Sequence, residues 1–152
     1  VIRRDIFRKP CDVNALATAA LYHDASEILT GDLPTPIKYH NAEIMSAYHA
    51  VEDLAVQKLL GMLPPELRGT YADVLAEDKD GDIYPLVKAA DKLSAYIKCI
   101  EERKAGNNEF LSAEAQTRAA LDASPLPEVH YFLEHFIPAF ERDLDELGAI
   151  GQ

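Results

Sequence analysis

Three ionisable side chains lie within five residues of one another: His23, Asp24 and Glu27. At about 100° per helical residue, Asp24 and Glu27 fall in the same sector as the apolar side chains of the surrounding segment, and His23 lies at its edge. Burying a carboxylate without a partner is costly, so such groups are normally paired or bound to a metal. A His–Asp pair that braces helices would account for a lone buried histidine. A histidine with two carboxylates, followed by the further acid Asp32, instead favours a functional site.

The ligand types in this cluster indicate which metals could bind. Mixed imidazole and carboxylate ligands suit Mn, Fe, Co, Ni or Zn better than Ca. Neighbours on a helix point about 100° apart, so His23 and Asp24 reach one ion only if it lies between them, and further ligands must come from other helices. Asp91 flanks the apolar stripe of a second helical segment. Periodicity leaves its role open between a ligand and a surface carboxylate that pairs with Lys88 or Lys98.

The segments that must position these residues show mainly the helical period of apolar side chains. No alternating pattern of useful length predicts a strand. Glycines follow several of the helical segments, and prolines begin others. We therefore expect one all-α domain over residues 1–152, built from six or seven helices. The basic stretch before Pro10 is predicted to be a loop. The predicted helices are residues 13–29, 41–60, 64–76, 85–104 and 109–121, followed by a helical pair over residues 127–147 that is bent at Pro138.

Composition narrows the classes of function. The chain has 152 residues and a formal net charge of −11, which disfavours a nucleic-acid polymer as a partner. A small phosphate ester is not excluded, because one bound cation can dominate the field at a site. No apolar run approaches the length of a membrane span, so no membrane partner is expected. The only cysteines, Cys11 and Cys99, share no motif, which fits a reducing compartment and predicts a cytoplasmic protein.

At these residues the sequence resembles a known family. Residues 21–27, LYHDASE, resemble the signature of HD-domain metal-dependent phosphohydrolases. Residues 28–39, ILTGDLPTPIKY, are a much more specific match and resemble the bacterial 5′-deoxynucleotidase branch of that family. Further similar stretches are residues 87–93, VKAADKL, and 105–110, AGNNEF. The resemblance runs from about residue 12 to 146.

The resemblance implies roles for individual residues. His23 and Asp24 would be the HD metal ligands and Asp91 the distal metal ligand. Glu27 matches a catalytic glutamate that positions or activates water. The substrate-binding positions that the resemblance implies are Asp24, Asp32, Leu33, Pro34, Thr35 and Asp91. The implied cofactor is a divalent transition metal: Co, Mn, Zn, Ni, Fe or Cu.

The implied activity is hydrolysis of the 5′-phosphate of deoxyribonucleoside monophosphates by an HD-domain helical bundle. The implied substrate partner is a small deoxynucleotide, and the implied assembly is a homodimer. One alternative keeps the fold and acts on another nucleotide phosphoester. A second is a degenerate HD domain that only binds a nucleotide or a partner protein. Screening phosphate esters separates the first alternative, and metal content with turnover separates the second.

The sequence departs from the family pattern near its start. The family holds its metal with two histidines and two aspartates, and the first histidine lies on an earlier helix that nothing before Asp12 matches. An arginine and a tryptophan that the family uses near its N-terminus also have no match, and the chain contains no tryptophan. We therefore expect the HD domain to be N-terminally incomplete here, with its first helices missing.

Overall fold

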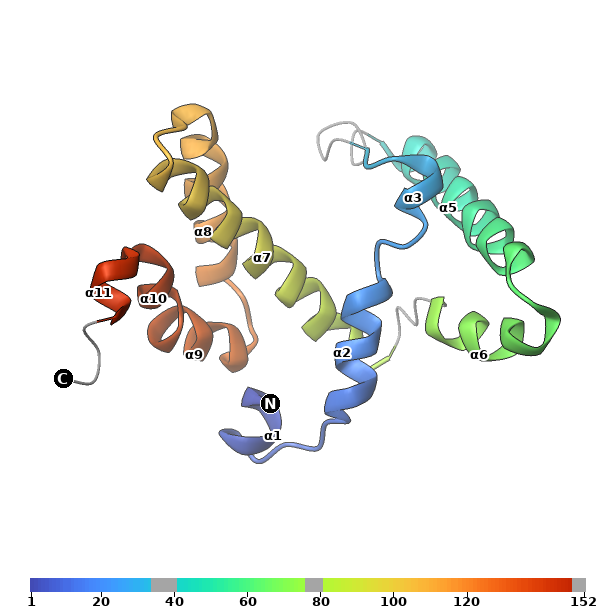
Figure 1. Ribbon diagram of the computed structural model, residues 1–152, viewed down its shortest axis with the longest axis horizontal. Coiled ribbons are helices and arrows are strands. Elements are labelled where there is room, and N and C mark those ends of the chain that lie inside the picture. Colours follow the sequence, from blue (N-terminus) through green and yellow to red (C-terminus); the bar gives the residue numbers. More distant parts are fainter. Residues whose placement is uncertain (34–40, 76–80, 149–152) are drawn as a thin grey trace. The chain divides into compact units, whose positions relative to one another are not determined.

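The computed structural model describes residues 1–33, 41–75 and 81–148. Every regular element within these ranges is helical, which confirms the all-α prediction (Figure 1). Among the described residues, no helix is both long and apolar enough to cross a membrane. The α-helices are α1 (Ile2–Asp5), α2 (Val13–Tyr22), α3 (Glu27–Thr30), α5 (Ala42–Met62), α6 (Pro65–Leu75), α7 (Tyr84–Lys104), α8 (Leu111–Asp122), α9 (Pro127–His135), α10 (Ile137–Glu141) and α11 (Leu144–Gly148), and the 3-10 turn η1 is Asn108–Phe110.

The chain divides into two compact units. The first combines residues 1–16 with the chain from Asp82 onward, and the second is Ala17–Gly81. The prediction of one domain over residues 1–152 stays a prediction.

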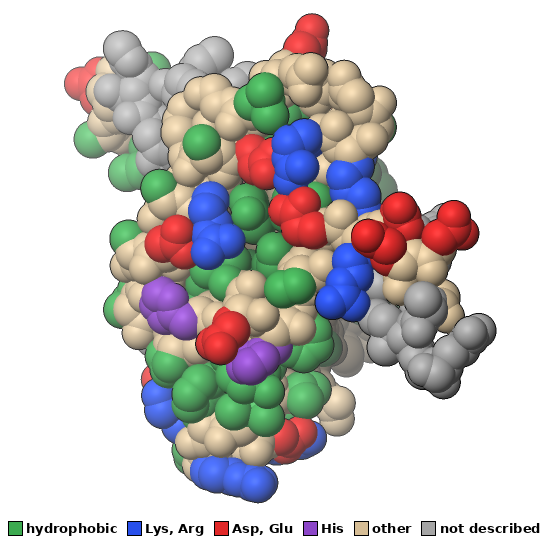
Figure 2. All heavy atoms as spheres, turned by 90° about the vertical axis from the view of Figure 1, so that its left-hand side faces the viewer, with side chains coloured by type: hydrophobic (Ala, Val, Ile, Leu, Met, Phe, Trp, Pro, Cys, Tyr) green, Lys and Arg blue, Asp and Glu red, His purple; other side chains and the backbone are tan. Residues whose placement is uncertain are grey.

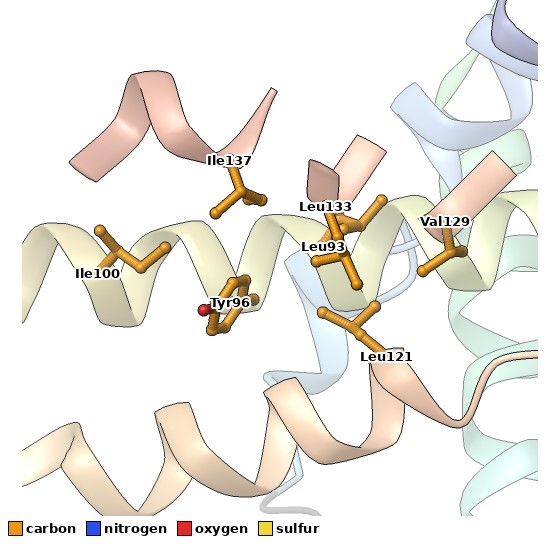
Figure 3. Close-up of a cluster of buried hydrophobic side chains, with 7 residues drawn as sticks. All are labelled: Leu93, Tyr96, Ile100, Leu121, Val129, Leu133 and Ile137. Carbon is orange, nitrogen blue, oxygen red and sulfur yellow. The ribbon is translucent and has the colours of Figure 1, made fainter. Parts of the chain in front are cut away.

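The core of the first unit is built on α7. This helix carries a proline in its first turn, where a missing N–H costs nothing, and basic residues in its last turn, where they complement the helix dipole. One face of α7 packs against α8, α9 and α10 (Figure 3). The side chains of this core are Leu93, Tyr96, Ile100, Leu121, Val129, Leu133 and Ile137.

An ion-pair network joins the same helices at their outer edge. The Arg103 guanidinium on α7 donates to Glu114 on α8 at 3.0 Å and to Glu141 on α10 at 2.8 Å. These hydrogen bonds, with that of Glu114 the strongest, raise the pKa of Arg103 above its ordinary value. Arg103 and Glu141 are partly exposed, so the network contributes less to stability than the apolar core beneath it.

The second unit has a smaller buried core. α5 packs against α3 and α6, and its buried side chains are Ala55 and Leu60. Asn41 begins α5 because its side-chain oxygen accepts the Ile44 N–H at 2.8 Å. Tyr22 of α2 packs edge-on against Tyr71 of α6, with ring centroids 6.2 Å apart.

A core substitution tests the packing of the first unit. Leu121 is 1% exposed, so Leu121→Ala should lower the free energy of unfolding by about 2–5 kcal/mol through lost burial and a residual cavity. Leu111, on the same helix, is 46% exposed, and Leu111→Ala should change it by about 0.5 kcal/mol or less. Urea unfolding of the two variants measures the difference. Equal losses would show that α8 does not bury the face described here.

Candidate active site

His23 completes the end of α2. The last four carbonyls of a helix have no partner within it, and those of Ala20 and Tyr22 belong to this set. The imidazole Nδ1 of His23 lies 2.8 Å from the Ala20 carbonyl oxygen. The backbone N–H of Ala25 donates to the Tyr22 carbonyl at 3.0 Å. The histidine side chain therefore caps the helix and is held in place by it.

This contact also fixes which imidazole nitrogen can bind a cation. A carbonyl oxygen only accepts, so Nδ1 must carry the proton that it donates to Ala20. In the neutral ring, Nε2 then keeps its lone pair. Metal-ligating histidines commonly use this arrangement, with the other ring nitrogen donating to a backbone carbonyl.

The carboxylate of Asp24 lies directly beside that lone pair. Its Oδ2 is 2.9 Å from His23 Nε2, and the His23 side chain is 15% exposed. When Nδ1 is the donor, Nε2 and the carboxylate oxygen are both acceptors, and a cation placed between them would be attracted by both. Two ligand atoms that share one transition metal at right angles lie about 3 Å apart. His23 and Asp24 therefore fit a metal site.

The segment around these two residues corrects the predicted helix over residues 13–29. α2 ends at Tyr22, and α3 begins at Glu27. The intervening turn contains a backbone hydrogen bond between residues three positions apart, in which the Glu27 N–H donates to the Asp24 carbonyl oxygen at 2.9 Å. The 100° rotation per residue therefore does not carry across it. Asp24, predicted to point into the core, has a side chain that is 52% exposed.

The turn after α3 carries the predicted substrate-binding residues. Gly31 ends α3 with φ 70° and ψ 164°, a conformation that is essentially restricted to glycine. Asp32, which follows it, is exposed, and Leu33 is half-buried. The predicted contacts from Pro34 and Thr35 lie outside the described residues.

Replacing Gly31 should therefore disturb this turn. Gly31→Ala has free space around the added methyl group, but the backbone conformation should cost about 1–3 kcal/mol. Gly69 lies within α6, with equally open space, and Gly69→Ala should be neutral or stabilising by up to about 1 kcal/mol. Thermal unfolding of the two variants compares them. If Gly31→Ala proves as stable as Gly69→Ala, a side chain is accepted at this backbone conformation.

Asp91 lies on α7, and its side chain is exposed, so it is not part of the α7 core. Of the two lysines predicted as its alternative partners, Lys98 pairs with Glu102 at 3.2 Å, and the Lys88 ammonium lies 5.7 Å from the centre of the Tyr84 ring. Asp91 belongs to the first unit and His23 to the second. The role of Asp91 as a metal ligand therefore stays a prediction.

The other described histidines have structural partners. His49 Nδ1 lies 2.8 Å from a Glu52 carboxylate oxygen. His135 packs on Tyr131 with ring centroids 4.2 Å apart, and His130 Nε2 lies 2.8 Å from the Ser124 carbonyl oxygen. On the face drawn in Figure 2, histidines lie among hydrophobic side chains, and acidic and basic side chains are interspersed.

One hydrogen bond to the turn after α3 was not predicted from the sequence. The phenol of Tyr48, on α5, donates a hydrogen bond of 3.1 Å to the Gly31 carbonyl oxygen. The two residues are 17 positions apart, and no periodicity predicts such a contact. Only the packing of α3 against α5 brings them together.

Comparisons with known proteins agree on one family. The family model described as 5′-deoxynucleotidase YfbR-like matches residues 1–140. The chain is 52% identical over 140 residues to the 5′-deoxynucleotidase YfbR of Shigella flexneri serotype 5b, a match that covers 90% of this chain and 70% of that relative. The match to the Escherichia coli K12/DH10B protein of the same name is 51% identical with the same coverage. A solved HD-domain phosphohydrolase from Listeria innocua is similar with a TM-score of 0.74 and 25% identity, covering 90% of this chain and 67% of that one.

Proposed function

The chain belongs to the YfbR-like 5′-deoxynucleotidase family, and we propose that it hydrolyses the 5′-phosphate of deoxyribonucleoside monophosphates to a deoxynucleoside and phosphate. One structural observation carries the proposal. The Nδ1 of His23 lies within hydrogen-bond distance of the Ala20 backbone carbonyl, and Nε2 lies beside the Asp24 carboxylate in an arrangement suited to a cation. A family match alone would not distinguish an intact site from a decayed one, and the arrangement of this pair supports an intact site.

His23, Asp24 and Asp91 would hold the metal, and each can offer one ligand atom. Imidazole and carboxylate ligands favour a divalent transition ion, and the candidates remain Co, Mn, Zn, Ni, Fe and Cu. A cation held there would supply Lewis acidity toward the phosphoryl oxygens and activate water for attack.

The remaining residues would bind the substrate and move the proton. Water would attack phosphorus, and the bond from phosphorus to the 5′ oxygen would break. Glu27 would accept the proton that the water gives up and pass it to the leaving 5′ oxygen, which yields the deoxynucleoside and phosphate. Its place in the first turn of α3, just after the His23–Asp24 turn, supports this role. Asp32, Leu33, Pro34 and Thr35 would hold the nucleotide, with the threonine hydroxyl donating a hydrogen bond.

The setting of the enzyme is also a proposal. Cys11 and Cys99 are both free thiols, which supports a reducing compartment and hence the cytoplasm. The resemblance implies a homodimer, and light scattering of the purified protein tests it. The substrate partner would be a small nucleotide.

Phosphate release from a panel of esters tests the activity. The whole protein, loaded in turn with Co, Mn and Zn, is assayed on deoxynucleoside 5′-monophosphates, ribonucleoside 5′-monophosphates, 3′-monophosphates and cyclic nucleotides. We expect the fastest metal-dependent release from the deoxynucleoside 5′-monophosphates, and loss of activity with a chelator. Faster hydrolysis of a cyclic nucleotide would assign another substrate, and nucleotide binding without turnover with any metal would indicate a degenerate domain.

A further inference from the structure

We infer that Tyr48 is a positioning residue for the nucleotide: its hydroxyl holds the turn that carries Asp32, and it does not touch the reacting atoms. This inference rests on the proposed function, because it gives a role to the same substrate-binding turn.

The geometry around Gly31 shows how the turn is held. Its N–H donates to the Glu27 carbonyl at 2.9 Å, which closes the end of α3. Its carbonyl oxygen lies 3.1 Å from the Tyr48 hydroxyl and 2.9 Å from the Thr30 hydroxyl. Both sides of this glycine are therefore anchored, one by α3 itself and the other by the neighbouring helix α5 (Figure 1).

The second anchor sets the direction of the chain into Asp32. The Gly31 carbonyl and the Asp32 nitrogen belong to the same planar peptide unit. A hydrogen bond that fixes the carbonyl oxygen therefore fixes the direction in which the Asp32 backbone leaves the helix. Glycine populates a wider range of backbone angles than any other residue, so this direction is weakly determined without an external contact.

Tyr48 is suited to this task because it comes from a long helix. α5 spans 21 residues and is packed against both α3 and α6. Thr30 lies next to Gly31 on the same short helix, so its hydroxyl moves with the turn. Among the described residues, the hydrogen bond from Tyr48 joins the Gly31 carbonyl to a helix other than α3.

The test removes one hydroxyl and keeps the ring. Tyr48→Phe deletes the donor to Gly31. The matched control is Tyr71→Phe, in the same unit, where the ring packs on Tyr22 and the described residues offer its hydroxyl no hydrogen bond. KM and kcat for a deoxynucleoside 5′-monophosphate, the metal content and the thermal midpoint are measured for both. In parallel, hydrogen exchange reports on the Asp32 and Leu33 amides without any substrate.

We expect Tyr48→Phe to raise KM about three- to tenfold, the range for loss of one hydrogen bond, with kcat, metal content and thermal midpoint unchanged. The Asp32 and Leu33 amides should exchange faster than in Tyr71→Phe. An unchanged KM and unchanged exchange would overturn the inference. So would a parallel fall of kcat, metal content and thermal midpoint, which would make Tyr48 a general structural residue. If the unsubstituted protein hydrolyses no deoxynucleotide, the proposed function fails by itself, and hydrogen exchange still decides whether Tyr48 holds the turn.

Discussion

Asp24→Asn should abolish both metal binding and turnover. An amide is nearly the same size as a carboxylate, but it lacks the negative charge that the cation needs beside His23 Nε2. Loss of the several kcal/mol of charge stabilisation that a metal gives to a phosphoryl transition state corresponds to a fall in kcat/KM of about 10³ or more. Metal content by elemental analysis and phosphate release from a deoxynucleoside 5′-monophosphate measure the two losses.

Asp73→Asn is the matched control for this experiment. Asp73 is an exposed aspartate on α6 in the same unit, so its substitution removes one negative charge from that unit without changing an expected ligand. Asp73 is not an expected ligand, so this variant should keep its metal and its turnover, and its free energy of unfolding should change by about 0.5 kcal/mol or less. An Asp24→Asn protein with full metal content and normal turnover would exclude Asp24 from the site.

Glu27→Gln should lower kcat by about 10²–10⁴ while leaving metal and nucleotide bound. The amide keeps the shape of the side chain and cannot accept a proton from water. Glu27 lies in the first turn of α3 and is not among the expected metal ligands, so the metal content should not change. Single-turnover phosphate release and metal analysis on the same sample separate the two effects.

Glu66→Gln supplies a control at an equivalent helix position. Glu66 lies in the first turn of α6, and Glu27 lies in the first turn of α3, so each carboxylate is near the N-terminal end of its own helix. Its substitution should leave kcat unchanged. A Glu27→Gln protein with near-normal kcat would remove this residue from the mechanism, and one that has lost its metal would make Glu27 a ligand.

The long helices could be predicted from the sequence because their signals are local. The helix predicted over residues 85–104 is α7, Tyr84–Lys104, and that over residues 41–60 is α5, Ala42–Met62. A proline in the first turn and a capping asparagine are short-range features, and the apolar period of 3.6 residues is maintained over several turns.

The breaks and the short helices could not be predicted. No glycine or proline separates α2 from α3, and the turn is closed by the His23 side chain and by bonds between residues three apart. α1 has only four residues, in a stretch that was predicted to be a loop. Its Arg3 pairs with the buried Glu128 of α9 at 3.2 Å, so tertiary contact rather than propensity supports it. The helical pair predicted over residues 127–147 has one more break than expected, because this stretch forms the three helices α9, α10 and α11.

The candidate site could be predicted in its residue types but not in its geometry. The spacing of His23, Asp24 and Glu27 predicted a cluster of ligands and a base, but the helical period wrongly predicted that Asp24 points into the core, whereas its side chain is 52% exposed. Which nitrogen of His23 is available depends on a carbonyl three residues earlier, and the direction of the Asp32 turn depends on Tyr48. Both contacts are set by the way the helices end and pack, which periodicity does not describe.

The most direct test of the metal site is a crystal structure of the whole protein grown with Co²⁺, with an anomalous difference map collected at the cobalt edge. We predict one strong peak at roughly 2.0–2.2 Å from His23 Nε2 and from carboxylate oxygens of Asp24 and Asp91. A peak on other residues, or an Asp91 carboxylate more than about 10 Å from His23, the diameter of a helix, would contradict it.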